Sequence, residues 1–302
     1  MRLKLLIIIL IVFYSHTIAE IKNDVYITAQ KKFILELYKN KRYFDCIAET
    51  QRLLNYKDKS LNNENLKYFI NTCYYSAEQY KTVISNLGTI DTGNIKNTKK
   101  PENLFLLSHS YHKIGYYNSS MNILNGINYS DIDESSRKNL FANKAEILIN
   151  NYEYNDIFLE IAKAEKYVNR INHSMTLQDL KKDLQRYNEI GLRSKWLSAS
   201  ISAVIPGAGQ VYSGKIMDGI LSFTAVAGSA FGTYYFYNKK EKPLALTFAF
   251  FTCLFYGGNV YGAWNSALYT NSRLNRQFAN ELIKKYDLNY NPGDYINTGI
   301  FE

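Results

Sequence analysis

Proline and cysteine are both scarce in this chain of 302 residues, which has four prolines and three cysteines. So few prolines exclude a proline-rich stalk, and so few cysteines exclude a small secreted scaffold built on disulfides. Ser, His, Asp and Glu residues occur along the chain, but nothing groups them into a catalytic set. We therefore expect neither an enzyme nor a bound cofactor or metal ion.

A basic stripe is also missing, although the formal net charge is +9. Residues 1–19 contribute +2 and residues 192–272 contribute +4, which leaves +3 for the rest of the chain. The excess of Lys and Arg therefore lies beside apolar segments, where it suits anionic lipid headgroups rather than nucleic acid. We expect membrane lipid as a partner and no nucleic acid.

Residues 1–19 have the three parts of an export signal. Arg2 and Lys4 form a positive start, an apolar run follows, and small residues lead to an expected cleavage site at Ala19. An uncleaved signal anchor is the alternative, although the apolar run is shorter than the ~20 residues that cross a bilayer. In both cases the segment that follows is expected to leave the cytoplasm.

Four similar passages recur between residues 24 and 170. They are marked by Tyr38, Tyr74, Tyr111 and Leu148, which are 36, 37 and 37 residues apart. A bulky residue follows each marker six positions later, across a short polar turn. A period of this length in a helical sequence indicates a stack of helix pairs. The residues expected to pack within the repeats are Tyr38, Phe44, Tyr74, Tyr80, Tyr111, Tyr117, Leu148 and Tyr154.

The third passage resembles the tetratricopeptide repeat. The residues that fall on that family's packing positions are Leu104, Leu107, Ser108, Tyr111, Gly115, Tyr117 and Ser120. The sequence departs from the family at Ile47, Val83 and Ile157, where the family prefers a small residue. The resemblance covers about half of the chain and implies a concave face that binds protein. The tyrosines themselves are expected mainly in the core.

Two pairs of residues in the repeats could carry chemistry. Cys46 and Cys73 fall on neighbouring helices of such a stack, so they are either two buried thiols or a disulfide, and both alternatives stay open. His109 and His112 would share one face of a helix. A zinc site needs a third protein ligand, and none is at ligand spacing, so both are expected as solvated residues at a helix end.

The chain after the repeats divides into three parts. Residues 171–192 are expected to form a capping and linking helix, residues 193–272 a membrane module, and residues 273–302 a polar C-terminal helix and tail. Within the module, residues 217–237 and 244–264 are each long enough, at about 1.5 Å per residue, to cross a hydrocarbon layer of ~30 Å. The polar turn between them is too short for anything but an antiparallel hairpin.

A glycine-rich motif precedes the first span. It consists of Pro206, Gly207, Gly209, Gln210, Tyr212, Gly214 and Asp218. The apolar and small residues 196–205 before it are too few to span, so they are expected to form a short interfacial helix. The motif resembles that of a bacterial two-transmembrane-helix module, which implies a cell-envelope protein but no particular activity. The glycines are expected to permit tight turns and close backbone approach, with lipid-headgroup or small-ligand contact by Gln210, Tyr212 and Lys215 as the alternative.

Each expected span carries two glycines four residues apart. They are Gly228 and Gly232 in the first span and Gly258 and Gly262 in the second, where Asn259 adds a polar group at membrane depth. Small residues let helices approach closely in lipid. Helix contact is therefore expected at these faces, within the hairpin or between copies of the chain in a homo-oligomer.

These observations predict an all-α protein, in which a tetratricopeptide-like helical solenoid precedes a two-helix transmembrane hairpin with a short interfacial helix. The expected location is the inner membrane of a bacterial cell envelope, with the repeats on the extracytoplasmic side. The expected function is a scaffold that binds another envelope protein of unknown identity. The alternative is an oligomeric pore or transport component built from the hairpin, with Asn259 and Asn265 lining a path.

Overall fold

The computed structural model describes residues 25–56, 61–88, 101–168, 170–171 and 175–295. Within this part of the chain the secondary structure is helical and there is no β-strand, which confirms the all-α class there. The expected export signal lies outside the described residues. The chain divides into two compact units, of which unit 1 comprises residues 1–147, 159–171 and 288–302, and unit 2 comprises residues 148–158 and 172–287.

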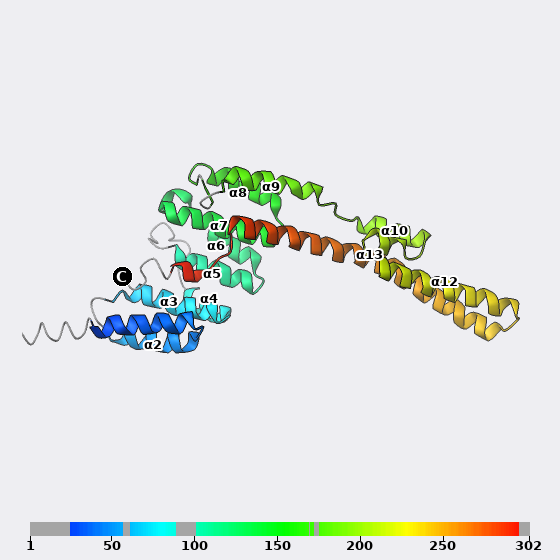
Figure 1. Cartoon of the computed structure of the whole chain (residues 1–302), viewed down its shortest axis with the longest axis horizontal. Helices are drawn as coiled ribbons and strands as arrows, with labels where there is room; N and C mark the ends of the chain where they lie inside the picture. Colours follow the sequence, from blue (N-terminus) through cyan, green and yellow to red (C-terminus); the bar gives the residue numbers. More distant parts are fainter. Residues whose placement is uncertain (1–24, 57–60, 89–100, 169, 172–174, 296–302) are drawn as a thin grey trace, which may run out of the picture. The chain divides into compact units, whose positions relative to one another are not determined.

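Unit 1 is built from short helices that follow one another in space as they do in sequence (Figure 1). A helix over residues 25–39 comes first. The next elements are α2 (Tyr43–Asn55), α3 (Asn63–Ser76), α4 (Tyr80–Leu87), α5 (Glu102–Lys113), α6 (Tyr117–Asn125), η2 (Tyr129–Asp131), α7 (Glu134–Asn150) and α8 (Tyr154–Ala164). Each helix from α2 to α6 packs on the next, and α3 also packs on α5. The last two helices, α7 and α8, contribute residues to both units.

The turn that joins two helices recurs with the same backbone geometry. Its central residue has a positive φ, and these residues are Lys41 (58°), Glu78 (59°), Gly115 (85°) and Tyr152 (62°), each 37 residues after the last. In the first turn the N–H of Arg42 donates to the carbonyl of Leu37, and that of Lys41 donates to Tyr38. This is the Schellman ending of a helix, which satisfies carbonyls that the helix itself leaves unpaired.

This geometry corrects the register of the first passage by one residue. The carbonyls that accept a hydrogen bond from the N–H five residues later belong to Leu37, Tyr74, Tyr111 and Leu148. The second helices of the pairs begin at Tyr43, Tyr80, Tyr117 and Tyr154. Tyr38 and Phe44 were therefore each placed one position too late. Phe44 is 63% exposed, whereas the ring of Tyr43 lies 5.5 Å from that of Tyr38. The aromatic side chains of the first passage are offset by one residue, and the position of the turn sets the repeat.

Small or narrow side chains stand where the two helices of a pair approach. Ser108 of α5 lies 2.9 Å from Ser120 of α6, Oγ to Oγ, and both are fully buried. At the corresponding place in the first pair, the thiol of Cys46 donates to the carbonyl of Ile34 at 3.3 Å. Cys46, and not Ile47, is thus the counterpart of Val83 and Ile157 in the corrected register. The first pair therefore does carry a small residue at this position.

Unit 2 contains α9 (Leu177–Gln185), η3 (Arg186–Glu189), α10 (Lys195–Val204), α11 (Ala208–Tyr212), α12 (Ile216–Asn238) and α13 (Lys242–Tyr286). A capping box starts α9, because Thr176 Oγ1 accepts the N–H of Asp179 and the Asp179 carboxylate accepts the N–H of Thr176. A positive φ at Lys240 closes the turn between α12 and α13, which pack along each other.

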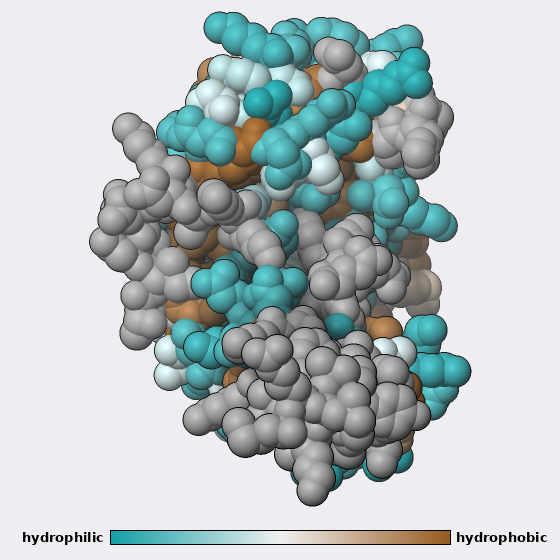
Figure 2. All heavy atoms as spheres, turned by 90° about the vertical axis from the view of Figure 1, so that its left-hand side faces the viewer, coloured by the Kyte–Doolittle hydropathy of each residue, from teal (hydrophilic) through white to brown (hydrophobic). Residues whose placement is uncertain are grey.

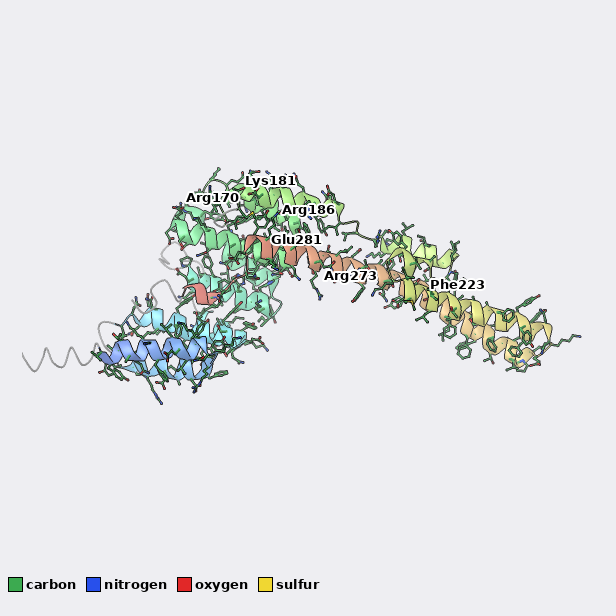
Figure 3. All side chains as sticks on the ribbon, viewed as in Figure 1. Arg170, Lys181, Arg186, Phe223, Arg273 and Glu281 are labelled. Carbon is green, nitrogen blue, oxygen red and sulfur yellow. The ribbon has the colours of Figure 1, made fainter. Side chains whose placement is uncertain are left out.

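The polar end of α13 is held by α9 and η3. Asp183 accepts hydrogen bonds from Lys285 (2.5 Å) and from the Tyr286 hydroxyl (2.8 Å). Burial alone would raise the pKa of Asp183, but these two donors outweigh it and the pKa lies below its ordinary value. Arg186 and Glu281 lie beside each other (Figure 3) and form an ion pair of 3.0 Å. The helices α9 and η3 thus brace α13 within unit 2.

The second expected span is only the first part of a much longer helix. It was predicted at about 244–264, with a separate polar helix from 273, but α13 continues without a break to Tyr286 and has 45 residues. No Pro or Gly interrupts the polar half, so nothing in the backbone ends the helix at the expected boundary. Residues 288–295, with η4 (Pro292–Tyr295), belong to unit 1 rather than to this helix.

Two helices, α12 and the first part of α13, are long and apolar enough to cross a membrane. Of the most apolar stretch of 18 residues in each helix, only 22% is buried in α12 and 11% in α13. The large apolar side chains that they expose include Ile216, Met217, Ile220, Leu221, Phe223, Phe231, Leu244, Leu246, Phe250, Phe251, Leu254 and Phe255. Figure 2 shows the molecule from the left-hand side of Figure 1. The coloured surface in this view is largely hydrophilic, with hydrophobic side chains between the polar ones.

Candidate functional sites: a polar clasp and a tyrosine groove

The glycine motif forms a buried hydrogen-bonded cluster in unit 2. We call it the polar clasp and define it by the residues Ser198, Ser202, Gly207, Gly209, Gln210 and Asn259. The first two come from α10, the next three from the turn and α11, and Asn259 comes from α13. All six are buried, with relative exposures that do not exceed 3% for Ser198, Ser202, Gln210 and Asn259.

Asn259 lies at the centre of the polar clasp. Its side-chain oxygen accepts the backbone N–H of Gly207 at 2.7 Å, and its side-chain nitrogen donates to the carbonyl of Ser202 at 2.9 Å. Gln210 donates to the backbone carbonyl of Asn259 at 2.9 Å and accepts the Ser202 hydroxyl at 2.8 Å. The amide group of Asn259 thus replaces hydrogen bonds that the bend between α10 and α11 leaves unmade, and Gln210 links Asn259 to the Ser202 hydroxyl.

The glycines of the motif allow backbones to touch. Gly207 has φ 85°, and a Cβ there would collide with the backbone carbonyl of Gly219 at the start of α12. A Cβ on Gly209 would collide with the carbonyl of Ser198 in α10. Gly214 also has a positive φ, 80°, but nothing lies within 4 Å of a Cβ built on it. Gly207 is therefore required by packing as well as by φ, Gly209 by packing alone and Gly214 by φ alone.

Serine and threonine hydroxyls extend the polar clasp along α13. Ser198 Oγ lies 2.7 Å from the carbonyl of Ala263 and 2.8 Å from that of Gly209. Thr270 donates to the carbonyl of Ser213 at 2.8 Å. These bonds attach α10 and α11 to a helix whose own carbonyls are already paired, so they add specificity to the docking of the three helices.

Cations lie over aromatic rings around the polar clasp. Lys195 Nζ is 4.9 Å from the centre of a Trp264 ring, and Lys215 Nζ is 4.0 Å from that of Tyr269. The Tyr256 hydroxyl donates to the carbonyl of Ala203 at 2.6 Å. Such amphipathic pairs are typical of the boundary between hydrocarbon and headgroups. Gln210, which was also considered for headgroup contact, is instead buried inside the polar clasp.

The remaining motif and helix-packing residues are placed as follows. Tyr212 accepts the N–H of Ser194, Pro206 is half-buried beside the bend, and Asp218 is exposed in the first turn of α12. Gly232 faces the ring of Phe248 on α13, and Gly262 faces the side chain of Gln210. Gly228 and Gly258 have open space around them. Within this chain, then, one glycine of each pair contacts a neighbour and the other is left uncovered.

Asn259 and Asn265 were both considered as residues that line a conducting path. Asn259 is 3% exposed and its amide is engaged in the polar clasp, whereas Asn265 is exposed on α13. The role for Asn259 in the pore alternative is therefore replaced by a structural one.

A second site lies in unit 1, where a cavity of about 500 Å³ opens along the first helices of the repeats. We call it the tyrosine groove. Its lining residues are Tyr38, Lys39, Lys41, Tyr43, Tyr75, Ser76, Glu78, Tyr80, Lys113, Tyr290, Asn291 and Pro292. Tyr38 and Tyr75 stand at equivalent repeat positions, as do Lys39, Ser76 and Lys113. The groove is thus built by the repeat itself, together with a segment from the end of the chain.

Tyr290 inserts among the residues at one end of the groove. Its ring is stacked on His109 with 4.0 Å between ring centres and 9° between planes, and it meets Tyr75 edge-on at 5.7 Å. Its backbone N–H donates to Glu146 Oε2 at 2.7 Å. The side chains of His109 and Glu146 therefore hold this piece of chain by its ring and by its backbone.

Burial determines the charges at this end of the groove. Burial lowers the pKa of His109 to about 3, so its ring is neutral at pH 7. Since Asn143 donates its own amide to Asn139, its Oδ1 accepts from His109 Nε2 at 2.6 Å. Burial raises the pKa of Glu146 to about 7, although the Tyr290 N–H and Lys113 act in the opposite direction. Glu146 is therefore poised between its two protonation states near neutral pH.

His109 differs from the expectation, whereas the two cysteines follow one of the two alternatives that were left open. His109 was expected to be solvated but is fully buried, because α5 packs against its neighbours on both sides, and His112 is half-buried. In the described part of the chain, no group of three His, Cys, Asp or Glu residues could hold a metal ion. Cys46 and Cys73 are buried as free thiols, and their hydrogen bond, together with burial, raises the pKa of Cys73.

The raised pKa of Glu146 makes a prediction for pH. The folded state binds the proton more tightly than the unfolded state, so the stability that this group contributes is present below pH 4.5 and lost as pH rises through 7. Glu146→Gln cannot titrate. As pH rises from 4.5 to 7.5, we therefore expect the free energy of unfolding of this variant to increase by about 3 kcal/mol relative to that of the wild type, at 1.36 kcal/mol per pKa unit.

This gain is measured from thermal unfolding followed by circular dichroism in detergent at both pH values. The exposed Glu153→Gln variant is the control and should follow the wild type at every pH. His109 Nε2 lies 3.8 Å from Glu146 Oε2, but burial lowers the pKa of His109 to about 3, below the pH range compared, so its folded-state titration does not produce the difference. A Glu146→Gln difference that is flat with pH would show that this carboxyl does not titrate near neutrality.

Of the residues that hold Tyr290, Glu146 was not singled out from the sequence, and His109 was considered only together with His112 as a metal ligand. A signal was nevertheless present, because Thr72, His109 and Glu146 are 37 residues apart and so share one repeat position. This shared repeat position was not recognised, because its three side chains have no chemical type in common. Ser198 and Ser202 of the polar clasp were missed because they look like ordinary small residues of an apolar helix.

Comparison of the chain with protein-family models, with curated proteins and with solved structures gave no match. The functional argument therefore depends on the geometry of the two sites.

Proposed function

We propose that this protein is a membrane-anchored scaffold that binds another protein of a bacterial cell envelope through its tyrosine groove. In this proposal, residues 24–170 form a tetratricopeptide-like solenoid and α12 and α13 form a transmembrane hairpin. The short helix α10 lies at the interface, and residues 1–19 direct the repeats to the extracytoplasmic side of the inner membrane.

The tyrosine groove is the observation that carries this proposal. Tyr38, Tyr75 and Lys113 come from successive first helices, so the same repeat that builds the core also builds one continuous lining. Aromatic side chains give large contact areas at a low entropic cost, which suits protein recognition. A binding role is further supported because Tyr290 already occupies part of this lining in the manner of a peptide.

The solenoid interpretation is supported by the recurrence of the turn. Positive φ at Lys41, Glu78, Gly115 and Tyr152 and the starts of four helices all follow one period of 37 residues. A constant spacing of this kind is what a stack of equivalent helix pairs requires. The contact between Ser108 and Ser120 occurs at positions that resemble the small-residue positions of the tetratricopeptide repeat.

The membrane interpretation is supported by exposed apolar surface. In α12 and the first part of α13, aromatic and aliphatic side chains remain uncovered by the rest of the chain. In water, such a surface would cost about 25 cal/mol per Å². The polar clasp supports the same interpretation, because every polar group at its centre is paired inside the protein, as hydrocarbon surroundings demand.

The membrane part of the proposal is tested by fractionation. Membranes from cells that make the full chain are washed with alkaline carbonate, and the protein should remain in the pellet until detergent is added. Protease outside spheroplasts should cleave the repeats and spare the turn at Lys240. Recovery of the chain in the carbonate supernatant would contradict membrane insertion, and protection of the repeats would contradict the proposed side.

The binding part is tested by crosslinking in intact cells. A photoreactive amino acid replaces Lys113, which lines the tyrosine groove, or Lys138, which lies on α7 outside it. Light should produce one discrete adduct to an envelope protein from position 113 and none from position 138. Equal adducts from both positions, or none from either, would contradict a partner in the groove.

A further inference from the structure

We propose that residues 288–293 are a displaceable ligand tethered to the tyrosine groove, and that the partner replaces them with an extended acidic peptide bearing an aromatic residue. This inference depends on the proposed binding function and specifies both its partner chemistry and its regulation. We call residues 288–293 the tail segment.

The tail segment contacts unit 1 as a peptide ligand would. Leu288 is 1% exposed, Pro292 is buried, and Tyr290 inserts its ring between His109 and Tyr75. One backbone N–H of the segment donates to Glu146, which lies beside the lining of the groove. Ring stacking combined with pairing of the main chain is how domains recognise extended peptides.

The tail segment fits the groove incompletely. The hydroxyl of Tyr75 and Nδ1 of His109 are buried and have no hydrogen-bond partner in the described part of the chain. Each unpaired buried group disfavours the occupied state. In addition, a cavity of about 500 Å³ remains beside Tyr290, between it and the first repeat. A ligand that pairs these two atoms and fills this cavity would bind better than the tail segment does.

Charge indicates which ligand this is. The groove is lined by Lys39, Lys41 and Lys113 against a single carboxylate at its rim, that of Glu78. The tail segment itself carries no charged side chain, because the two aspartates of residues 287–294 flank it on either side. Because the lining is basic, complementarity favours a ligand that brings carboxylates of its own, which is an acidic peptide. The ring-binding place between His109 and Tyr75 adds the requirement for an aromatic residue.

Tethering determines how strongly an external peptide competes. A segment joined to the same chain has a high effective concentration and reduces the apparent affinity of any competitor. We therefore expect that loss of the tail segment increases the affinity for an added peptide at least about tenfold. The increase should require the contacts of Tyr290, since these are the ones that the competitor takes over.

The test uses a fluorescent peptide with the sequence of residues 286–295 and the full chain purified in detergent. Fluorescence anisotropy gives its affinity for the wild type, for a chain that ends at Asp287, and for the full-length Tyr290→Ala variant. We expect both altered chains to bind at least about tenfold more tightly than the wild type. A peptide with alanine in place of the tyrosine corresponding to Tyr290 should bind none of them.

Equal affinities of the three proteins, or no binding to any, would overturn the inference. The Tyr290→Ala variant decides the matter if the shortened chain does not fold. The proposed function has a separate readout, the adduct from position 113. An adduct without peptide binding would support the proposed scaffold function and contradict the tethered ligand. Peptide binding without an adduct would support the tethered ligand and contradict the proposed scaffold function.

Discussion

Replacing Asn259 with leucine is expected to destabilise the membrane module by about 4 kcal/mol or more. Leucine is of similar size, but it leaves the N–H of Gly207 and the carbonyl of Ser202 without the partners that they have at 2.7 and 2.9 Å. Each buried unpaired group costs about 1–3 kcal/mol. Gln210 loses one of its acceptors as well, so the loss spreads through the polar clasp.

The two tryptophans provide a local measurement of this effect. Trp196 and Trp264 are the only ones in the chain, and their rings meet edge-on at 4.4 Å beside the polar clasp. Thermal unfolding followed by tryptophan fluorescence in detergent therefore reports on this module alone. Asn265→Leu is the matched control, because Asn265 is exposed on the same helix and should change the midpoint little. Similar midpoints for the two leucine variants would contradict the central role of Asn259.

Replacing Gly207 with alanine is expected to cost about 3 kcal/mol or more, which is the second large effect. Its φ of 85° alone penalises a Cβ by about 1–2 kcal/mol. The Cβ would also collide with the backbone of Gly219, and a backbone cannot rotate away as a flexible side chain can. The start of α12 would have to shift, and the bond between Gly207 and Asn259 would lengthen.

Gly214→Ala separates these two contributions. Gly214 belongs to the same motif and has a φ of 80°, but a Cβ there meets nothing within 4 Å. It should therefore lose only the penalty for φ, about 1–2 kcal/mol. Both variants are measured by the same tryptophan transition. If Gly214→Ala were as damaging as Gly207→Ala, close approach would not be the reason for the glycine at 207.

The repeats show how far the sequence can be followed. The period of 37 residues and the tyrosines that mark it were visible, because a repeated helix pair needs bulky residues at fixed places. The register of the first unit was not visible, because Tyr38 has the same side chain as Tyr74 but lies one position after the residue equivalent to it, Leu37. Only the hydrogen bond from Arg42 to Leu37 places the turn, and with it Tyr43 in the packed position and Phe44 on the surface.

For both sites, too, the sequence predicted one part and only the tertiary structure showed the rest. The glycine motif was recognised from its letters, and a structural role for its glycines was expected. That Asn259 pairs with Gly207 required the tertiary structure, because the two residues are 52 positions apart. Resemblance implied only a concave face with no particular residues, and neither the tyrosine groove nor the contact of Glu146 with Tyr290 was foreseen.

By itself, the sequence determined the local properties of this protein: helix formation, the repeat period, the apolar length of two helices and the positions where glycine permits an unusual φ. These follow from interactions between residues a few positions apart. Tertiary structure alone decided which polar atoms are paired, that His109 is neutral and buried, and that residues 288–293 lie in the groove of the repeats. Those outcomes depend on which surfaces exclude water together, and that is set by packing between segments distant in sequence.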